Sequence, residues 1–285
     1  MTQSAAALNR SHQTEAQAAS GERMLPRSDG TQRRRSILTK TVQQDVIPRL
    51  LEQRSPVPPG RKRVGELQIA TLADLTLHAE GSAAVDFVTS LLEQGFSAES
   101  LYLDLLSPAA ALLGQYWDDD VCSFTDVTIG LGHLQHVMRA LGPAFFGRHT
   151  LEMPNGPRAF LMPLPGGQHA FGLTMLSDFF RRAGWHTWSG AVANSSELRT
   201  MVAAEWVDLV GFSLACDEML DTARAEIAAV RRASRNPAVV VMVGGPPFVS
   251  NPDLAEAIGA DGTAGDGLQA VAAAQALLPA RNRRP

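Results

Sequence analysis

Several short loops in this chain combine glycine with a few polar side chains that could hold a ligand. The first is Pro165-Gly166-Gly167-Gln168-His169-Ala170-Phe171-Gly172, the next begins at Ser213, and the others contain Gly244-Gly245 and the run from Gly259 to Asp266. Glycine lets a ligand approach the backbone closely, and loops on a rigid scaffold often carry binding residues. The sequence shows neither a nucleophile with a paired base nor a pair of catalytic carboxylates, so we predict a binding protein and not an enzyme.

The elements around these loops alternate between strands and helices. Apolar runs at 159–162, 185–188, 207–212 and 239–243 predict buried parallel strands, with helical spacing near 169–183, 195–204, 217–234 and 252–258. This rhythm predicts an α/β fold, a Rossmann-like doubly wound parallel sheet over residues 157–279. The ligand crevice of such a sheet lies at the carboxyl ends of its strands, so we expect the loops to meet there.

A dinucleotide site is disfavoured at this crevice. It would need G-x-G-x-x-G at the start of the first helix and an acidic residue after the second strand. The first loop lacks that spacing, and the second strand ends with Trp188-Ser189-Gly190.

Residues 64–150 predict an all-α segment. Apolar residues recur at helical spacing from Leu67 to Leu77, from Val85 to Leu92, from Leu101 to Trp117 despite Pro108, and from near Ser123 to Leu141. Ser123 with Asp126 predicts a helix-capping pair. These patterns indicate a four-helix-bundle cap that precedes the sheet.

Residues 1–63 predict a disordered arm with two basic clusters, Arg33-Arg34-Arg35 and Arg61-Lys62-Arg63. We interpret the arm either as a solvated linker or as a segment that contacts DNA weakly. A net charge of −4 and an isoelectric point near 6.0 argue against wholesale coating of nucleic acid. There is no apolar run of about 18 residues, as a membrane span requires, and no signal peptide, so we expect a cytoplasmic protein.

The loop residues carry a resemblance to the cobalamin-binding module of methionine synthase, methylmalonyl-CoA mutases and cobalamin photoreceptors. His169 and Gly172 match the D-x-H-x-x-G motif of that family, Ser213 and Gly244-Gly245 match its next two motifs, and Gly259-Ala260-Asp261 with Asp266 matches the last. The resemblance implies that His169 is the lower ligand of cobalt. It also implies that the serine and the paired glycines line a slot for the displaced nucleotide tail of the cofactor.

The cap resembles the same family in the segment from Gly114 to Thr128, where Trp117 and Phe124 fall at positions that cover the upper face of the corrin ring. Together these matches imply one set of cofactor-binding residues. The set is Trp117, Phe124, Val127, Thr128, Gln168, His169, Ala170, Phe171, Gly172, Ser213, Leu214, Gly244, Gly245, Gly265 and Asp266.

The string W-D-D-D-x-C-S-F-T-D-V-T-x-G-x-x-x-L-Q, which starts at Trp117, is similar to the AerR or PpaA antirepressors of photosynthetic bacteria. This resemblance implies a cobalamin-dependent, light-responsive regulator that binds a repressor of photosystem genes of the CrtJ or PpsR type. It implies the aquo or hydroxo form of cobalamin, with adenosyl- and methylcobalamin as alternatives. A corrinoid carrier for methyl transfer is the alternative function.

Two departures from the wider family bear on this choice. Gly167 stands where the family has the Asp that hydrogen-bonds the ligating histidine, a loss that counts against methyl transfer and is tolerable in a sensor. Val127-Thr128 replaces a Glu-His pair of the adenosylcobalamin photoreceptors, and Asp118 replaces their histidine after the tryptophan.

Other reactive residues have plainer interpretations. His133, His136 and His149 are predicted to be solvated or satisfied in the core, although His133 is also a candidate for the upper cobalt ligand. Cys216 is predicted to be a small buried residue and not a redox centre. Asp118-Asp119-Asp120 is predicted to be a charged turn between helices and not a metal site.

Overall fold

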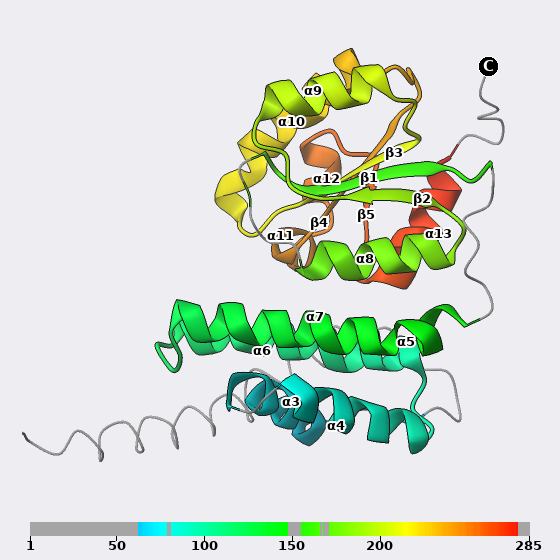
Figure 1. Cartoon of the computed structure of the whole chain (residues 1–285). Helices are drawn as coiled ribbons and strands as arrows, with labels where there is room; N and C mark the ends of the chain where they lie inside the picture. The colour runs from blue at the N-terminus through cyan, green and yellow to red at the C-terminus, as the bar shows by residue number, and fades with distance from the viewer. Residues whose placement is uncertain (1–61, 79–80, 148–154, 166, 168–170, 279–285) are drawn as a thin grey trace, which may run out of the picture. The chain divides into compact units, whose positions relative to one another are not determined.

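The computed structural model describes residues 62–78, 81–147, 155–165, 167 and 171–278, which all lie in one compact unit, Gln43–Pro285 (Figure 1). Apart from Lys62 and Arg63, the predicted arm lies outside the described residues. The boundaries of the predicted cap and sheet domains stay predictions. Within the described ranges, no helix combines the length and the apolar composition needed to cross a bilayer.

Four helices of the N-terminal half pack on one another, as the apolar spacing predicts. They are α3 (Glu66–His78), α4 (Gly81–Glu93), α6 (Ser107–Asp118) and α7 (Phe124–Phe146), and all pairs except α4 with α6 share extensive contacts. Ile69, Leu112 and Leu134 are fully buried among them. The predicted capping pair at the N-terminus of α7 is also present. The Ser123 hydroxyl accepts from the Asp126 N–H, and the Asp126 carboxylate accepts from the Ser123 N–H.

The predicted third helix contains a π-helical segment. It begins as α5 (Ala98–Ser100), continues as the π-helix η2 (Leu101–Leu106) and ends as α6. The N–H of Ser107 donates to the Tyr102 carbonyl five residues earlier, and Pro108, which has no N–H, stands in the first turn of α6. The residues before α6 are themselves helical, so the helix passes Pro108 without a break.

The C-terminal half contains a five-stranded parallel sheet in the order β2-β1-β3-β4-β5. The strands are β1 (Arg158–Pro163), β2 (His186–Ser189), β3 (Leu209–Ser213), β4 (Val240–Gly244) and β5 (Gly262–Thr263). The first four confirm the predicted strands to within two residues at each end, and the two-residue β5 was not predicted. The chain order reverses between β1 and β3, which is where ligands bind to open sheets of this type.

Helices cover both faces of the sheet. On one face the core contains residues of α9 (Ser195–Ala204), α10 (Leu220–Ala233, after the 3-10 turn η3, Asp217–Met219), α11 (Pro246–Ser250) and α12 (Leu254–Ala257). On the other face it contains residues of α8 (Phe171–Arg182) and α13 (Gly267–Leu277).

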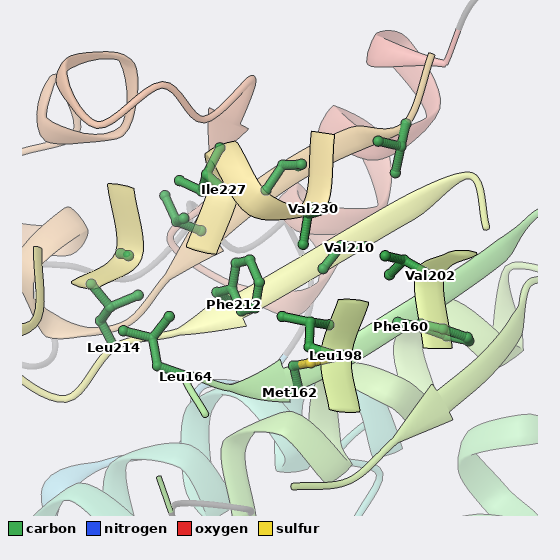
Figure 2. Packing of buried hydrophobic residues seen from close by; sticks show 14 of the residues in the cluster. Phe160, Met162, Leu164, Leu198, Val202, Val210, Phe212, Leu214, Ile227 and Val230 are labelled. Atoms are coloured by element: carbon green, nitrogen blue, oxygen red, sulfur yellow. The ribbon is translucent and has the colours of Figure 1, made fainter. Parts of the chain in front are cut away.

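Successive strand residues alternate between these two cores, as the pleat of a strand requires. Phe160 and Met162 point into the first core, shown in Figure 2, whereas Ala159 and Leu161 belong to the second. Because both faces are covered, the central strands β1, β3 and β4 are almost entirely apolar and buried. The edge strand β2 was also predicted to be buried, but it is polar at His186, Thr187 and Ser189 and is partly exposed, because it has a neighbouring strand on one side only.

Candidate functional site

The carboxyl ends of the three central strands lie in register. Pro163 of β1 is paired with Ser213 of β3, and Ser213 is paired with Gly244 of β4. Beyond this line the Leu214 N–H donates to the Gly244 carbonyl at 2.9 Å. The loops that follow β3 and β4 are therefore held side by side, as the sequence predicts.

A cavity of about 700 Å³ opens at these loops and extends over the face of the sheet covered by α8 and α13. Six of the predicted cofactor-binding residues line it. They are Gly172, Ser213, Gly244, Gly245, Gly265 and Asp266. The structure thus brings together residues at or beside four separate strand-to-helix connections around one space.

The residues of this wall fit a bulky ligand. A β-carbon built on Gly172 or on Gly244 meets no other atom within 4 Å, so both glycines leave room beside the backbone. The Ser213 hydroxyl lines the cavity and forms no hydrogen bond with any described residue. A hydroxyl in this position can donate to or accept from a ligand.

Asp266 is the N-cap residue of α13, and Gly265 directly precedes it. Asp266 caps the helix by accepting from the Gln269 N–H at 2.8 Å, and the Gln269 side-chain amide donates to its other oxygen at 3.0 Å. The carboxylate of Asp266 is therefore fixed in place at the rim of the cavity by local contacts.

The opposite wall of the cavity comes from the helical half, which the sequence analysis did not assign to this site. Glu99, Ser100 and Asp104 line the cavity, together with Leu103 and Ser107. Asp104 is only 8% exposed, and its carboxylate accepts from the Ser100 hydroxyl at 2.7 Å. Its sequence signal is an acidic residue inside the apolar run Leu101-Tyr102-Leu103-Asp104-Leu105-Leu106.

Two predicted residues of the loops lie elsewhere. Leu214 is 1% exposed and belongs to the core beneath α9 and α10, so its side chain turns away from the cavity. Phe171 is 9% exposed at the start of α8 and is absent from the described cavity lining. Their apolar side chains gain more from burial in the core than from exposure at the rim.

The four predicted residues at the junction of α6 and α7 do not line the cavity. Trp117 and Phe124 are 48% and 66% exposed, and their rings meet edge to face with centroids 6.2 Å apart. Thr128 is exposed and donates to the Phe124 carbonyl, whereas Val127 is half-buried. Their contact with the corrin ring stays a prediction.

His133 packs against α3. Its Nδ1 lies 2.9 Å from the Thr76 carbonyl oxygen, and His133 is not among the described residues that line the cavity. Its role as an upper cobalt ligand stays a prediction. Gln168, His169 and Ala170 lie outside the described residues.

Two plain interpretations can be compared with the structure. Asp118, Asp119 and Asp120 are exposed at the turn after α6, as predicted. Cys216 was predicted to be buried, but it is exposed, because it directly precedes the surface turn η3. A hydrogen bond with Glu218 raises the pKa of Cys216, which favours the protonated thiol.

The π-helical segment makes a polar contact with α8 beside the cavity. The buried hydroxyl of Tyr102 lies 3.1 Å from the Met138 carbonyl oxygen and 3.2 Å from Oδ2 of Asp178. Burial, together with the nearby Asp178, raises the pKa of Tyr102, so the phenol remains a hydrogen-bond donor at neutral pH. Burial also raises the pKa of Asp178, although the Tyr102 bond and Arg181 oppose this effect.

An ion pair and an aromatic cluster complete the junction between the two halves. Arg182 Nη1 lies 3.2 Å from Oε2 of Glu99, and its guanidinium stands over the Phe145 ring at 4.7 Å from the centroid. The Phe145 ring stacks on Tyr102 and meets Phe179 edge to face. The helical half is thus fastened to α8 at one end of the cavity wall.

Comparisons with known proteins agree with this architecture. Residues 158–275 match the family described as B12 binding domain. An uncharacterized 20.5 kDa protein in the bchF-crtJ intergenic region of Rhodobacter capsulatus is 30% identical over 86 residues, which are 30% of this chain and 44% of that protein. The match thus spans less than half the length of this relative.

Among solved structures, the monomethylamine corrinoid protein of Methanosarcina barkeri superposes with a TM-score of 0.63 and 16% identity, over 75% of this chain and all of that one. A cobalamin-binding protein of Desulfitobacterium hafniense is 18% identical over 75% of this chain and 98% of that one, with a TM-score of 0.40. The first of these shows that the fold is shared. Residues 158–275 thus match the B12 binding domain family, and the carboxyl ends of their central strands lie at the cavity.

Proposed function

We propose that this chain is a cobalamin-dependent antirepressor that binds a photosystem-gene repressor of the CrtJ or PpsR type. The observation that carries the proposal is the cavity lined by Ser213, Gly244 and Gly245, within a segment that matches the B12 binding domain. The Rhodobacter capsulatus relative supports the regulatory part, since its description places it beside crtJ. The similarity of the Trp117 string to antirepressors points in the same direction.

Each part of the site has a separate task in this proposal. Gly172 and Gly244 leave space for the nucleotide tail, and the Ser213 hydroxyl orients it. His169 is the lower cobalt ligand that the resemblance implies. The exposed pair Trp117 and Phe124 covers the upper face of the ring. Bound cobalamin would supply the chromophore and an exchangeable upper ligand.

Regulation requires that the ligand interact differently with two arrangements of the protein. The cavity suits this requirement because its walls come from both halves of the described chain. A change of the upper ligand would alter contacts with the helical half, while Tyr102, Glu99 and their partners on α8 hold the junction. The repressor would then recognise one arrangement over the other.

A corrinoid carrier for methyl transfer is the second candidate. The fold shared with the Methanosarcina barkeri corrinoid protein favours it, because that similarity covers all of that chain. Gly167 in place of the family's Asp disfavours it, since a carboxylate partner orients a ligating histidine and raises its basicity.

The first test is the visible spectrum of the full chain loaded with hydroxo-, methyl- or adenosylcobalamin, in the dark and after illumination. We expect cobalamin to remain bound through gel filtration and the spectrum to shift in His169→Ala. His136→Ala, an exposed histidine on α7, is the matched control and should leave the spectrum unchanged. Loss of all cobalamin from the unmodified protein would refute cofactor binding.

The second test separates the two functions. Purified repressor of the CrtJ or PpsR type and a corrinoid methyltransferase are each passed over the immobilised, cobalamin-loaded chain. If the repressor is retained, and its retention depends on cobalamin and changes with light, the antirepressor function is supported. Retention of the methyltransferase alone, with transfer of a methyl group from methylcobalamin, supports the carrier.

A further inference from the structure

The part of the cavity that lies in the sheet half has a polar rim and an apolar interior. The polar side chains that line it there are Ser213, Ser250 and Asp266, and all three lie at or beyond the carboxyl ends of strands. The interior lies between the sheet, α8 and α13, where the lining residues belong to the second core or pack against it. These interior residues are Leu161, Leu173, Leu176, Phe180, Leu209, Met242 and Ala270.

The interior extends well under the face of the sheet. Ser213 ends β3 at the rim, and Leu209, at the other end of the same strand, still lines the cavity. At about 3.3 Å per residue, this corresponds to a depth of about 13 Å. Gly211 lies between them on the same face, and a β-carbon there would stand 2.8 Å from Cδ2 of Leu161. The Leu161 side chain therefore takes the place of a side chain at residue 211, and aliphatic carbon covers the floor.

The interior residues carry no side-chain nitrogen or oxygen. The backbone groups of their strands are engaged in the parallel pairing of β3 with β1 and β4. Ser177 of α8 is buried, but its hydroxyl lies 2.8 Å from the Thr187 hydroxyl, and it does not line the cavity. Within the described part of the chain, a polar group of a ligand would thus find no side-chain partner in the interior.

The polar wall of the helical half does not change this picture. The helical half contacts α8 through Phe179, whose ring meets Tyr102 edge to face, and through Arg182, which pairs with Glu99. Leu176 and Phe180 lie on another side of the helix, against the sheet.

The chemistry of the nucleotide tail of a corrinoid matches this division. The tail consists of a phosphate, a ribose and a base. The phosphate is charged and the ribose has hydroxyl groups, so both are costly to bury without partners and fit the rim. Dimethylbenzimidazole, the base of cobalamin, is a flat aromatic ring with two methyl groups and fits the interior. Adenine, the base of other natural corrinoids, has an amine and further ring nitrogens that would lose water there without gaining a hydrogen bond.

We propose that the apolar interior is a specificity site for the base of the tail, which accepts a benzimidazole and discriminates against a purine. The proposal rests on the proposed binding of cobalamin. Leu176 is a specificity-determining residue in it, because its half-buried side chain lines the interior from α8. The rim and the interior thus read different parts of the same tail.

The experiment compares hydroxocobalamin with the corrinoid that carries adenine in place of dimethylbenzimidazole. Dissociation constants are measured for the unmodified full chain, for Leu176→Gln and for Leu220→Gln. Leu220 is a matched control, a half-buried leucine of α10 that packs on the other core and does not line the cavity. The readout is the ratio of the two constants, adenine form over benzimidazole form. The cost of detaching each base from cobalt is the same for every variant, so it cancels when these ratios are compared.

We expect Leu220→Gln to keep the ratio of the unmodified chain. Leu176→Gln should lower the ratio about tenfold, because glutamine offers the purine both a donor and an acceptor and is a poor neighbour for the benzimidazole. Cobinamide, which has no nucleotide tail, should bind to Leu176→Gln as it does to the unmodified chain.

An unchanged ratio in Leu176→Gln would overturn the proposal and leave cobalamin binding intact. A loss of affinity for cobinamide as large as the loss for hydroxocobalamin would overturn it as well, since the tail would then not be the part that meets Leu176. If the unmodified chain binds none of the ligands, the proposed function and this inference fail together. Should Leu176→Gln fail to fold, Met242→Gln takes its place, because glutamine is similar in length to methionine, and an unchanged ratio in that variant overturns the proposal.

Discussion

A β-carbon on residue 245 would lie 2.0 Å from the carbonyl oxygen of Leu214, so the backbones of Gly245 and Leu214 pass too close together for any side chain at residue 245. The backbone of Gly245 also has a φ of 113°, a conformation that side chains other than glycine rarely adopt. The paired glycines of the sequence therefore have separate tasks. Gly245 permits the crossing of two loops, and Gly244 leaves space in the cavity.

Gly245→Ala should destabilise the protein by about 3 kcal/mol or more, because it combines a backbone clash with an unfavourable φ. Gly259→Ala is the matched control, since Gly259 has a φ of 85° but no atom within 4 Å of an added β-carbon. It should cost only about 1 kcal/mol. Urea denaturation of cobalamin-free protein measures the loss of unfolding free energy in both variants. Equal losses would contradict the close contact between residue 245 and the Leu214 carbonyl.

Gly244→Val should leave the free energy of unfolding within about 1 kcal/mol of its original value, because an added β-carbon meets no atom within 4 Å and the γ-carbons would extend into the cavity that Gly244 lines. The same substitution should weaken binding of hydroxocobalamin at least about tenfold by filling the cavity. Gly132→Val on α7, also without neighbours and outside the cavity, serves as the control for affinity. Unchanged affinity in Gly244→Val would show that the ligand does not occupy this space.

The raised pKa of Asp178 predicts a pH dependence of stability. The folded protein keeps this proton above the ordinary pKa of 3.8, where the unfolded chain has lost it. The associated stability is therefore present at low pH and declines as pH rises from about 3.8 through the folded pKa. Unfolding in urea between about pH 4 and pH 8 should show this decline, and Asp178→Asn should lack it.

Tyr102→Phe should move the same decline to higher pH, because the Tyr102 hydrogen bond lowers the pKa of Asp178. Asp221→Asn, an exposed carboxylate on α10, is the control and should retain the original profile. A profile for Tyr102→Phe that coincides with that of the unmodified protein would mean that the phenol donates to the Met138 carbonyl instead.

Ser123→Ala should destabilise the protein by about 1 kcal/mol through loss of the α7 cap. Hydrogen bonds from Ser123, and to a smaller extent the charge of His78, lower the pKa of Asp126. A lowered pKa stabilises the fold above the ordinary pKa, and that stability is lost as pH falls through the folded pKa. The cost of Ser123→Ala should therefore be larger at neutral pH than in acid, with Thr125→Ala as the exposed control.

The sequence predicts the sheet well where long-range pairing agrees with local pattern. The apolar run at 207–212 becomes β3, and its one-residue extension to Ser213 follows from pairing with Gly244. The two-residue β5 has no apolar run of its own, because its position is set by its pairing with β4. The Asp261 side chain accepts from the Val241 N–H, and the two strands pair from the next residues onward, Met242 with Gly262.

Proline does not prevent a helix after β4. Pro246 and Pro247 fit the first turn of α11, where N–H groups have no helical partner. The loop walls of the cavity were predictable because they follow strands. The wall from Glu99 to Ser107 was not, since nothing in its apolar spacing tells which helix faces the sheet.

The π-helical turn of η2 has a consequence for comparing homologous chains. A π-helix holds more residues per turn than an α-helix, so a homologue with one residue fewer between 101 and 106 can form a continuous α-helix. Because the wider π turn takes up the extra residue, the deletion would leave the residues before 101 facing nearly the same way relative to α6. A single gap in an alignment at this point would therefore mark a homologue without the π-helical turn, with the flanking helical residues in equivalent positions.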